Sequence, residues 1–290
     1  MKIFKKLIDF FVFCLNLLNQ IFLKLFSISF LGYLKEQLEN YCYVKKTILG
    51  KKINFFCPNR LIEWRVKTFE NKEPETLDWI NRFSRDKRII FWDIGANIGL
   101  YSIYAALKSE NMDVVAFEPS TSNLRVLSRN ISINKLQNRI KIINQPLSDI
   151  KNNFSTFNES TFQEGGALNT FKEKYDFTGN ISKFKNSYNL LGTNINDLLN
   201  RGVVHIPDYI KIDVDGIEHL ILRGGLDYLS NQKLKSVLIE VNENFLTQFE
   251  QVKDIMHKCN FEFEKKDRND DFYQNSEFEK MYNYIFIKKQ

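Results

Sequence analysis

The chain has little cysteine, and its cysteines form no recognisable pattern. Four are present in 290 residues, at Cys14, Cys42, Cys57 and Cys259, and no pair has the C-x-x-C spacing. Cysteines scattered in this way argue against a zinc site and against a disulfide framework, and they fit a reducing compartment. We therefore expect a cytoplasmic protein.

Dense clusters of positive charge are absent as well. The 41 basic and 35 acidic residues give a formal net charge of +6 that is spread along the chain. A nucleic-acid-binding protein would need a basic stripe, so we expect no nucleic-acid partner. With 43% hydrophobic and 26% charged residues the composition is that of a globular protein, and the length allows one large core with an appendage.

Residues 88–101 contain a strand, a tight turn and the start of a helix. The strand, residues 89–92, is apolar without alternation, which is typical of a strand covered on both faces in a parallel α/β sheet. Gly95 allows a sharp turn, and Gly99 allows the next helix to pack closely. Because ligands bind at the carboxyl ends of such strands, this loop predicts a nucleotide-like cofactor site.

The loop itself indicates which cofactor binds. Its pattern is Gly95-x-Asn97-x-Gly99 after Asp93, whereas a dinucleotide fingerprint reads G-x-G-x-x-G. A pyrophosphate is disfavoured beside the acid. S-adenosylmethionine carries an ammonium group, which Asp93 could hold directly or through water, and a carboxylate, which amides near the helix start could bind. The loop therefore favours S-adenosylmethionine.

Acidic and polar residues also follow the next two strands. Glu118 ends the strand at residues 114–117 and lies about 20 residues after Gly95, the spacing at which a carboxylate accepts the ribose hydroxyls. Ser148 and Asp149 follow the third strand and could meet the adenine amine. The alternatives are that Glu118, like Asp93, only caps a helix, and that Ser148 and Asp149 only form a polar turn.

The second half of the chain completes the sheet. Residues 209–212 form a strand that leads into Asp213, and residues 236–241 form another. The last strands, at 261–266 and 281–289, have no helix between them, so they must be antiparallel neighbours, directly or through an intervening strand. This predicts a Rossmann-like class I methyltransferase fold: an α/β domain with a mostly parallel seven-stranded sheet and an antiparallel C-terminal strand.

From about Leu49 to Lys288 the sequence resembles the FkbM family of S-adenosylmethionine-dependent methyltransferases. The resemblance implies methyl transfer to a hydroxyl of a sugar, glycan or related natural product, often in polysaccharide biosynthesis. Family members commonly carry Glu where this chain has Asp215. The resemblance rests on residues 93–99 with Tyr101, Phe117-Glu118-Pro119 with Asn123, Leu147-Ser148-Asp149, and residues 210–218. The cofactor-binding residues that we predict are Asp93, Gly95, Asn97, Gly99, Tyr101, Glu118, Ser148 and Asp149.

Asp213 is the predicted general base. A sulfonium is already activated, so the enzyme must align the hydroxyl and remove its proton, and Asp213 follows a strand that should neighbour the strand of Asp93. Lys211, two residues back, could keep Asp213 ionised, and Glu240 completes the predicted catalytic set. We assign no metal ligands. The alternatives are that Asp213, Asp215 and Glu240 hold Mg²⁺, or that His219 is the base.

The first thirty residues predict an amphipathic helix. Membrane-spanning and signal-peptide interpretations are disfavoured, because the uncharged stretch between Asp9 and Lys24 is short and no small-residue cleavage site follows it. The helix either lies on a membrane surface or packs on protein. Its polar face carries Lys2, Lys5, Lys6, Asp9, Asn16, Gln20 and Lys24, and its apolar face carries Phe4, Leu7, Phe11, Cys14, Leu18, Phe22 and Leu25.

The expected organisation is a helical segment at 1–40, a cap of hairpin and helices at 41–87, and the methyltransferase domain at 88–290. Residues 152–190 lack periodicity and predict a partly mobile insertion on the substrate side. Peripheral contact with the cytoplasmic face of a membrane is the expectation for the first segment. Two other functions stay open: a nicotinamide-dependent oxidoreductase, and a non-catalytic, membrane-associated Rossmann module.

Overall fold

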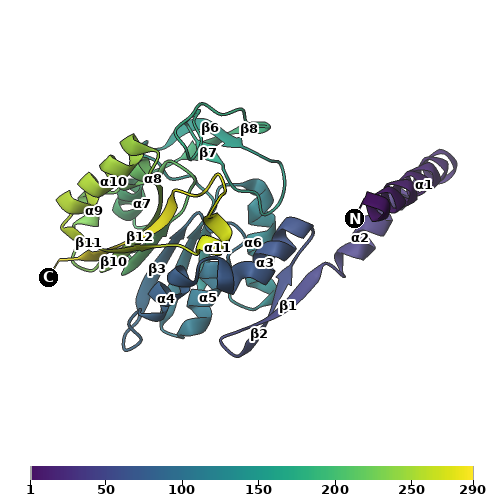
Figure 1. Ribbon diagram of the computed structural model, residues 1–290. Helices are drawn as coiled ribbons and strands as arrows, with labels where there is room; N and C mark the ends of the chain where they lie inside the picture. The colour runs from purple at the N-terminus through teal and green to yellow at the C-terminus, as the bar shows by residue number, and fades with distance from the viewer. Residues whose placement is uncertain (1, 290) are drawn as a thin grey trace. The chain divides into compact units, whose positions relative to one another are not determined.

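A computed structural model describes the backbone of residues 2–289, and the side chains from residue 3 onward (Figure 1). It contains two compact units, Met1–Tyr43 and Val44–Gln290. Of the cap predicted at 41–87, residues 44–87 belong to the same compact unit as the sheet, and the separate cap stays a prediction.

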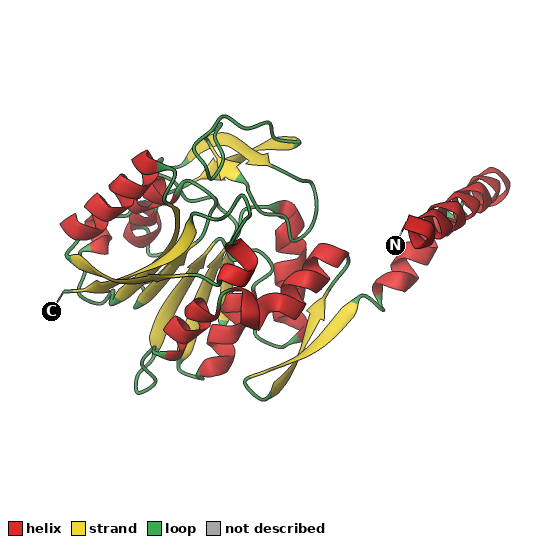
Figure 2. Ribbon diagram, in the orientation of Figure 1, coloured by secondary structure: helices red, strands yellow, loops and turns green. Residues whose placement is uncertain are grey.

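The second unit is built on a seven-stranded sheet with the order β11-β12-β10-β9-β3-β4-β5 (Figure 2). Strands β5, β4, β3, β9 and β10 are parallel, and β12 is antiparallel to both β10 and β11. This confirms the predicted sheet, although a short helix, α11 (Asp270–Tyr273), lies between the last two strands, where none was expected. The strands are β3 (Ile89–Ile94), β4 (Met112–Phe117), β5 (Ile140–Ile143), β9 (Tyr209–Ile212), β10 (Ser236–Asn242), β11 (Phe261–Asp267) and β12 (Met281–Lys288).

Helices cover both faces of this sheet, with α8 and α10 on one face and α4 and α5 on the other (Figure 1). Apolar side chains of the strands, including Trp92, Ile210 and Val237, form one core with Leu222 and Met256 of the covering helices. Burial on both faces explains why the strands are apolar without alternation. The helices are α5 (Leu100–Lys108), α6 (Thr121–Ile133), α7 (Ile195–Asn200), α8 (Glu218–Arg223), α9 (Leu226–Leu229) and α10 (Leu246–Lys258).

Four elements precede the sheet: β1 (Tyr43–Ile48), β2 (Lys51–Phe56), α3 (Arg60–Lys72) and α4 (Pro74–Asn81). The predicted hairpin is present, and Pro74 is at the start of α4 as expected. The backbone N–H of Phe56 donates to Oδ1 of Asn130 at 2.8 Å, which ties β2 to α6. Helix α3 contacts the insertion through Arg65, whose side chain donates to the carbonyl of Gly165, and α3 also lines the cavity described below.

The segment at residues 152–190 contains a small three-stranded sheet that the sequence did not suggest, and the long connections between its strands are irregular. Strand β6 (Asn153–Glu159) pairs antiparallel with β7 (Thr170–Phe171) and β8 (Asn186–Gly192). Its strands are rich in asparagine and serine, so their hydrophobic alternation is weak and the pattern was missed.

The first unit contains α1 (Lys2–Phe26) and α2 (Phe30–Glu39). The Ser29 side chain caps α2 by accepting from the N–H of Gly32 at 3.0 Å. Oδ1 of Asn19, on α1, accepts from the N–H of Leu31 at 3.0 Å. By length and composition, Ile3–Phe26 is long enough and apolar enough to cross a membrane, so the length of the helix does not exclude a span as the sequence had suggested.

Candidate active site

A cavity of about 630 Å³ opens at the carboxyl ends of the parallel strands in the second unit. Its wall is formed by the loops that follow β3, β4, β5 and β9, together with side chains from α3, β10, α11 and the insertion. This volume lies within the range of ligand-binding pockets, and ligands of open α/β sheets bind at this edge. The cavity is therefore the candidate active site.

The glycine loop after β3 forms one wall of the cavity. Gly95 has a φ of 87°, and a side chain there would collide with the backbone carbonyl of Asp213, so only glycine fits. Its N–H donates to the carbonyl of Phe117 at 3.0 Å. Gly99 has a φ of 86° and lies at the start of α5 outside the cavity wall, where a side chain would meet Leu127.

Asp93 is fully buried and is not among the residues that line the cavity. Its Oδ2 accepts from the Ser102 hydroxyl at 2.5 Å, and its Oδ1 is buried without a hydrogen-bond partner among the described residues. Burial raises the pKa of the Asp93 carboxyl. From this position Asp93 does not reach a bound molecule directly. Of the two predicted ways of holding the cofactor ammonium, the one through water stays a prediction.

Glu118 lines the cavity and is held by two backbone amides. Its Oε2 accepts from the N–H of Asn97, and its Oε1 from the N–H of Ser120, both at 2.8 Å. Burial raises the pKa of Glu118 to about 8, and these amides oppose the shift. Each carboxyl oxygen keeps a lone pair for a hydroxyl group.

Asn97 contributes to the cavity wall in a second way. It adopts a φ of 50°, and its Nδ2 donates to the carbonyl of Gly166 in the insertion at 2.8 Å. Asn123 donates to the same carbonyl at 3.1 Å, and Arg65 donates to the carbonyl of Gly165 at 2.7 Å. The insertion is thus fastened over the glycine loop. Oδ1 of Asn97 is buried without a partner among residues 3–289.

The two residues that were predicted to contact adenine do not line the cavity. Ser148 is fully buried, and Asp149 pairs with Lys172 at 3.0 Å and Arg223 at 3.4 Å; neither lines the cavity. Residues 145–147 of the same turn line it instead. The prediction thus identified the correct edge of the sheet, but the cavity wall is formed by the residues just before those named.

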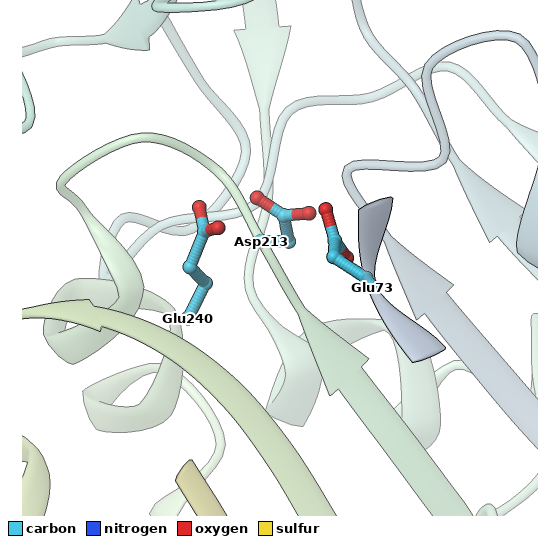
Figure 3. Close-up of side chains that lie close together, drawn as sticks. All are labelled: Glu73, Asp213 and Glu240. Atoms are coloured by element: carbon cyan, nitrogen blue, oxygen red, sulfur yellow. The ribbon is translucent and has the colours of Figure 1, made fainter. Parts of the chain in front are cut away.

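Three carboxyl groups that line the cavity lie close together near the carboxyl ends of β9 and β10 (Figure 3). They belong to Glu73, Asp213 and Glu240, and their nearest oxygens all lie within 4.8 Å of one another. Asp215, the third ligand of the Mg²⁺ alternative, points elsewhere: its Oδ2 accepts from the N–H of Leu168 at 2.7 Å. Glu73 takes its place, and the sequence analysis missed it.

Two lysines neutralise part of this cluster. Nζ of Lys211 lies 2.5 Å from Oδ2 of Asp213, and Nζ of Lys72 lies 2.8 Å from Oε1 of Glu73. Lys211 is almost wholly buried and contacts the face of the Tyr101 ring. Burial lowers the pKa of Lys211, but Asp213 and the neighbouring acids outweigh it and raise that pKa.

Both carboxyl oxygens of Glu73 have hydrogen-bond partners. Oε2 accepts from the Tyr101 hydroxyl at 2.7 Å, and Oε1 accepts from the Tyr273 hydroxyl at 3.4 Å as well as from Lys72. Burial raises the pKa of Glu73, but the ammonium groups of Lys72 and Lys211 outweigh it and lower that pKa to about 2. Tyr101, predicted as a cofactor contact, lines the cavity and orients Glu73.

Glu240 differs from the other two acids. It is only 8% exposed, lines the cavity, and receives no hydrogen bond from an N–H group of any described residue. Burial, followed by the charges of Asp213 and Glu73, raises the pKa of Glu240 well above its ordinary value. With Glu240 neutral, the two remaining carboxylates balance the ammonium groups of Lys72 and Lys211.

His219 is removed from the site. It is buried on α8, does not line the cavity, and its Nδ1 has no partner within the described part of the chain. Burial lowers the pKa of His219 to about 4, so the ring is neutral at pH 7. The neighbouring Glu218 accepts from the N–H groups of Val214 and Gly216 and holds the loop after Asp213. This position gives no support to the alternative of His219 as base.

A Rossmann-like sheet closed by antiparallel strands, with a glycine loop after β3 and acids after β4 and β9 lining one cavity, is typical of the class of S-adenosylmethionine-dependent methyltransferases. The family model described as "Methyltransferase FkbM domain" matches residues 93–263, more than half of the chain. The chain belongs to the FkbM methyltransferase family, and its cofactor is S-adenosylmethionine.

Three similar proteins place this family membership in context. The AMB antimetabolite synthetase AmbE of Pseudomonas aeruginosa is 28% identical over an alignment of 183 residues that covers 52% of this chain and 8% of AmbE. Methyltransferase sdnD of Sordaria araneosa is 41% identical over 56 residues, 19% of this chain and 22% of sdnD. The chain thus spans less than a quarter of either relative. The crystal structure of Methyltransferase FkbM from Methylobacillus flagellatus aligns with a TM-score of 0.44 and 15% identity, covering 71% of this chain and 44% of that one.

The residues of the cavity fit this cofactor. Glu118 offers two oriented carboxyl oxygens to a ribose diol, and the unpartnered Oδ1 of Asn97 offers an acceptor beside them. Phe117 and Leu147 also line the cavity and offer apolar surface for an adenine ring.

Proposed function

We propose that this protein is an O-methyltransferase that acts on a hydroxyl of a sugar, glycan or related natural product. The observation that carries the proposal is the Lys211–Asp213 pair at the end of β9, next to the cofactor strand β3. Asp213 lines the cavity, while the ammonium of the almost fully buried Lys211 pairs with it. This arrangement provides a carboxylate base for a hydroxyl proton.

The cofactor supplies a methyl group that the positive sulfur already activates. What the chain must add is alignment of the acceptor oxygen and a place for its proton. Lys211 engages Oδ2 of Asp213, and Glu240 also hydrogen-bonds to this carboxylate, so the acceptor hydroxyl must replace the Glu240 contact to give its proton to Asp213. When Asp213 takes that proton, the ammonium of Lys211 keeps Glu73 as a charged neighbour, so the pocket is not left with an isolated buried cation.

Glu240 and the apolar lining favour a hydroxyl compound as acceptor. As a neutral acid, Glu240 can donate a hydrogen bond to one acceptor oxygen while Asp213 accepts from another, which fits neighbouring hydroxyls on a ring. Trp64, Phe272 and Phe278 also line the cavity and offer flat apolar surfaces for the faces of a sugar or a natural-product ring.

The Mg²⁺ alternative is less favoured. Oxygen-rich magnesium sites need carboxylates that are open to the ion, whereas Glu73 and Asp213 already bind Lys72 and Lys211. The oxidoreductase and non-catalytic alternatives gain no support from the family, and the acids at the cavity, including Glu118 and Asp213, are present. We retain the cytoplasm as the proposed location and polysaccharide biosynthesis as the proposed setting.

Release of S-adenosylhomocysteine tests the function. Purified protein would be incubated with S-adenosylmethionine and parallel panels of hydroxyl acceptors (monosaccharides, nucleotide sugars, oligosaccharides) and matched amino sugars and amines. We expect product only with hydroxyl acceptors, and at least about 100-fold slower product formation by the Asp213→Asn variant at equal cofactor occupancy. Methylation of the amines alone would overturn O-methyl transfer, and binding of NAD in preference to S-adenosylmethionine would overturn the methyltransferase assignment.

A further inference from the structure

Helix α1 presents a long apolar face that its own unit does not cover. Phe4, Leu7 and Phe11 are each more than 60% exposed, and Leu18 and Leu25 continue the same face. Within the first unit, α2 contacts α1 near its end through the Asn19 side chain and the pairing of the Phe22 and Phe30 rings. Exposed apolar surface of this extent marks a binding surface rather than ordinary surface variation.

The charges of α1 point to the occupant. Lys5 and Lys6 lie near the start of the helix and Lys24 near its end, and their sequence positions place them on the polar side, opposite the apolar face. Asp9 is the one acid in the helix. A helix with lysines flanking a broad apolar face is complementary to a lipid surface that combines anionic headgroups with acyl chains.

We propose that α1 binds in the plane of an anionic lipid bilayer, with its apolar face in the acyl region and its lysines among the headgroups. Helix α1 is long enough and apolar enough to cross a bilayer, so the feature that favours an in-plane position is its polar side, which begins with Lys5, Lys6 and Asp9 and ends with Lys24. Asn16 and Gln20 extend the polar side along the helix. The inference does not depend on the proposed methyl transfer.

Vesicle flotation of the full-length protein tests this surface. We expect the protein to float with phosphatidylcholine vesicles that contain phosphatidylglycerol, and to bind pure phosphatidylcholine much more weakly. Lys5→Gln with Lys6→Gln should weaken binding to the anionic vesicles about 30-fold, because each lysine near the surface contributes about 1 kcal/mol. Phe11→Asp with Leu18→Asp should weaken it at least about 100-fold, because two buried apolar side chains are lost.

Two matched variants control for charge and for exposed hydrophobicity outside α1. Lys183→Gln with Lys185→Gln removes the same charge from exposed positions in the insertion, and Ile181→Asp replaces an apolar residue that is 90% exposed. Both should bind vesicles as the wild type does. Circular dichroism of every variant should show unchanged helix content.

Three results would overturn the proposal. One is an absence of flotation with anionic vesicles, which would assign the apolar face to protein packing. A second is equal binding by the wild type and the Phe11→Asp, Leu18→Asp variant. The third is membrane association that survives both high salt and alkaline carbonate, which would assign α1 as a spanning helix rather than one lying in the surface.

Discussion

Nζ of Lys211 lies 2.5 Å from Oδ2 of Asp213, and the lysine is 1% exposed whereas the aspartate faces the cavity. The two residues lie on the same side of the chain at the end of β9, because side chains two positions apart in a strand share a face. Burying an ammonium is costly without partners, and Lys211 is surrounded by Asp213, Glu73 and Asp93. The pair thus holds the Asp213 carboxylate at the cavity wall, while the ammonium groups of Lys72 and Lys211 balance the negative charge of the cluster.

Asp213→Asn should abolish most of the methyl transfer while leaving cofactor binding nearly intact. Asparagine keeps the shape and a hydrogen-bonding oxygen but loses the basic oxygen, so loss of a general base predicts a rate loss of about 10²–10⁴-fold. Turnover and calorimetric S-adenosylmethionine affinity would be measured together. Asp254→Asn, an exposed replacement of the same type on α10, is the control. Full activity in Asp213→Asn would remove Asp213 from the chemistry.

The fold was predictable from the sequence because each strand of the sheet is a short apolar run followed by a turn. The neighbouring positions of β3 and β9 followed from the doubly wound order, and the pairing of Asp93 with Lys211 in register confirms it. The predicted antiparallel ending is confirmed by β12, which pairs antiparallel with both β10 and β11. Local patterns thus sufficed for the parallel core.

The cluster at the site was only partly predictable. Asp213 and Glu240 lie at strand positions that the sequence placed at the correct edge, but Glu73 comes from the segment before α4. Its local sequence, Lys72-Glu73-Pro74, is typical of a helix start and gives no sign of a site. Only the packing of that segment against the sheet brings Glu73 to Asp213, and no spacing rule encodes such a contact.

Glu240→Gln should retain most of the activity, whereas Glu240→Ala should not. Glutamine keeps a hydrogen-bond donor where we infer a neutral carboxylic acid, and alanine leaves the site without one. As the pH rises through the raised pKa of Glu240, the wild type should lose activity through ionisation of this acid, and Glu240→Gln should lack that fall. The charged and polar groups that face Glu240 are Lys72, Tyr273, Glu73 and Asp213.

The effect of Mg²⁺ on activity distinguishes a metal site at the three carboxyls from the role of Glu240 as a neutral acid. If the three carboxyls held Mg²⁺, EDTA would abolish wild-type activity, Mg²⁺ would restore it, and Glu240→Gln would be as damaging as Asp213→Asn. We expect chelation to change little, because Lys72 and Lys211 already supply the positive charge.

Glu73→Gln should destabilise the protein at neutral pH by about 2–3 kcal/mol, because it leaves buried ammonium groups with one carboxylate fewer. The folded pKa of Glu73 is about 2, below the ordinary value of 4.5, so its stabilisation is present above about pH 4.5 and is lost as the pH falls toward 2. Urea unfolding at pH 7 and pH 3 would measure this. Glu70→Gln, which breaks the exposed pair with Lys46, should cost under about 1 kcal/mol. Equal costs for the two variants would contradict the account.

Glu118 should make the affinity for S-adenosylmethionine depend on pH. Its pKa is raised to about 8 by burial, so in the ligand-free protein it is largely neutral at about pH 6 and becomes ionised as the pH rises past 8. A ribose diol donates two hydrogen bonds and favours the ionised form, so binding should tighten over this range. Glu118→Gln should remove the pH dependence, and Glu118→Ala should weaken binding by about 10- to 150-fold, the equivalent of about 1.5–3 kcal/mol for one charged hydrogen bond. Calorimetric titrations across the range, with Glu250→Gln on the exposed side of α10 as the control, would measure both effects. An affinity unchanged by pH and by both Glu118 substitutions would place the ribose elsewhere in the cavity.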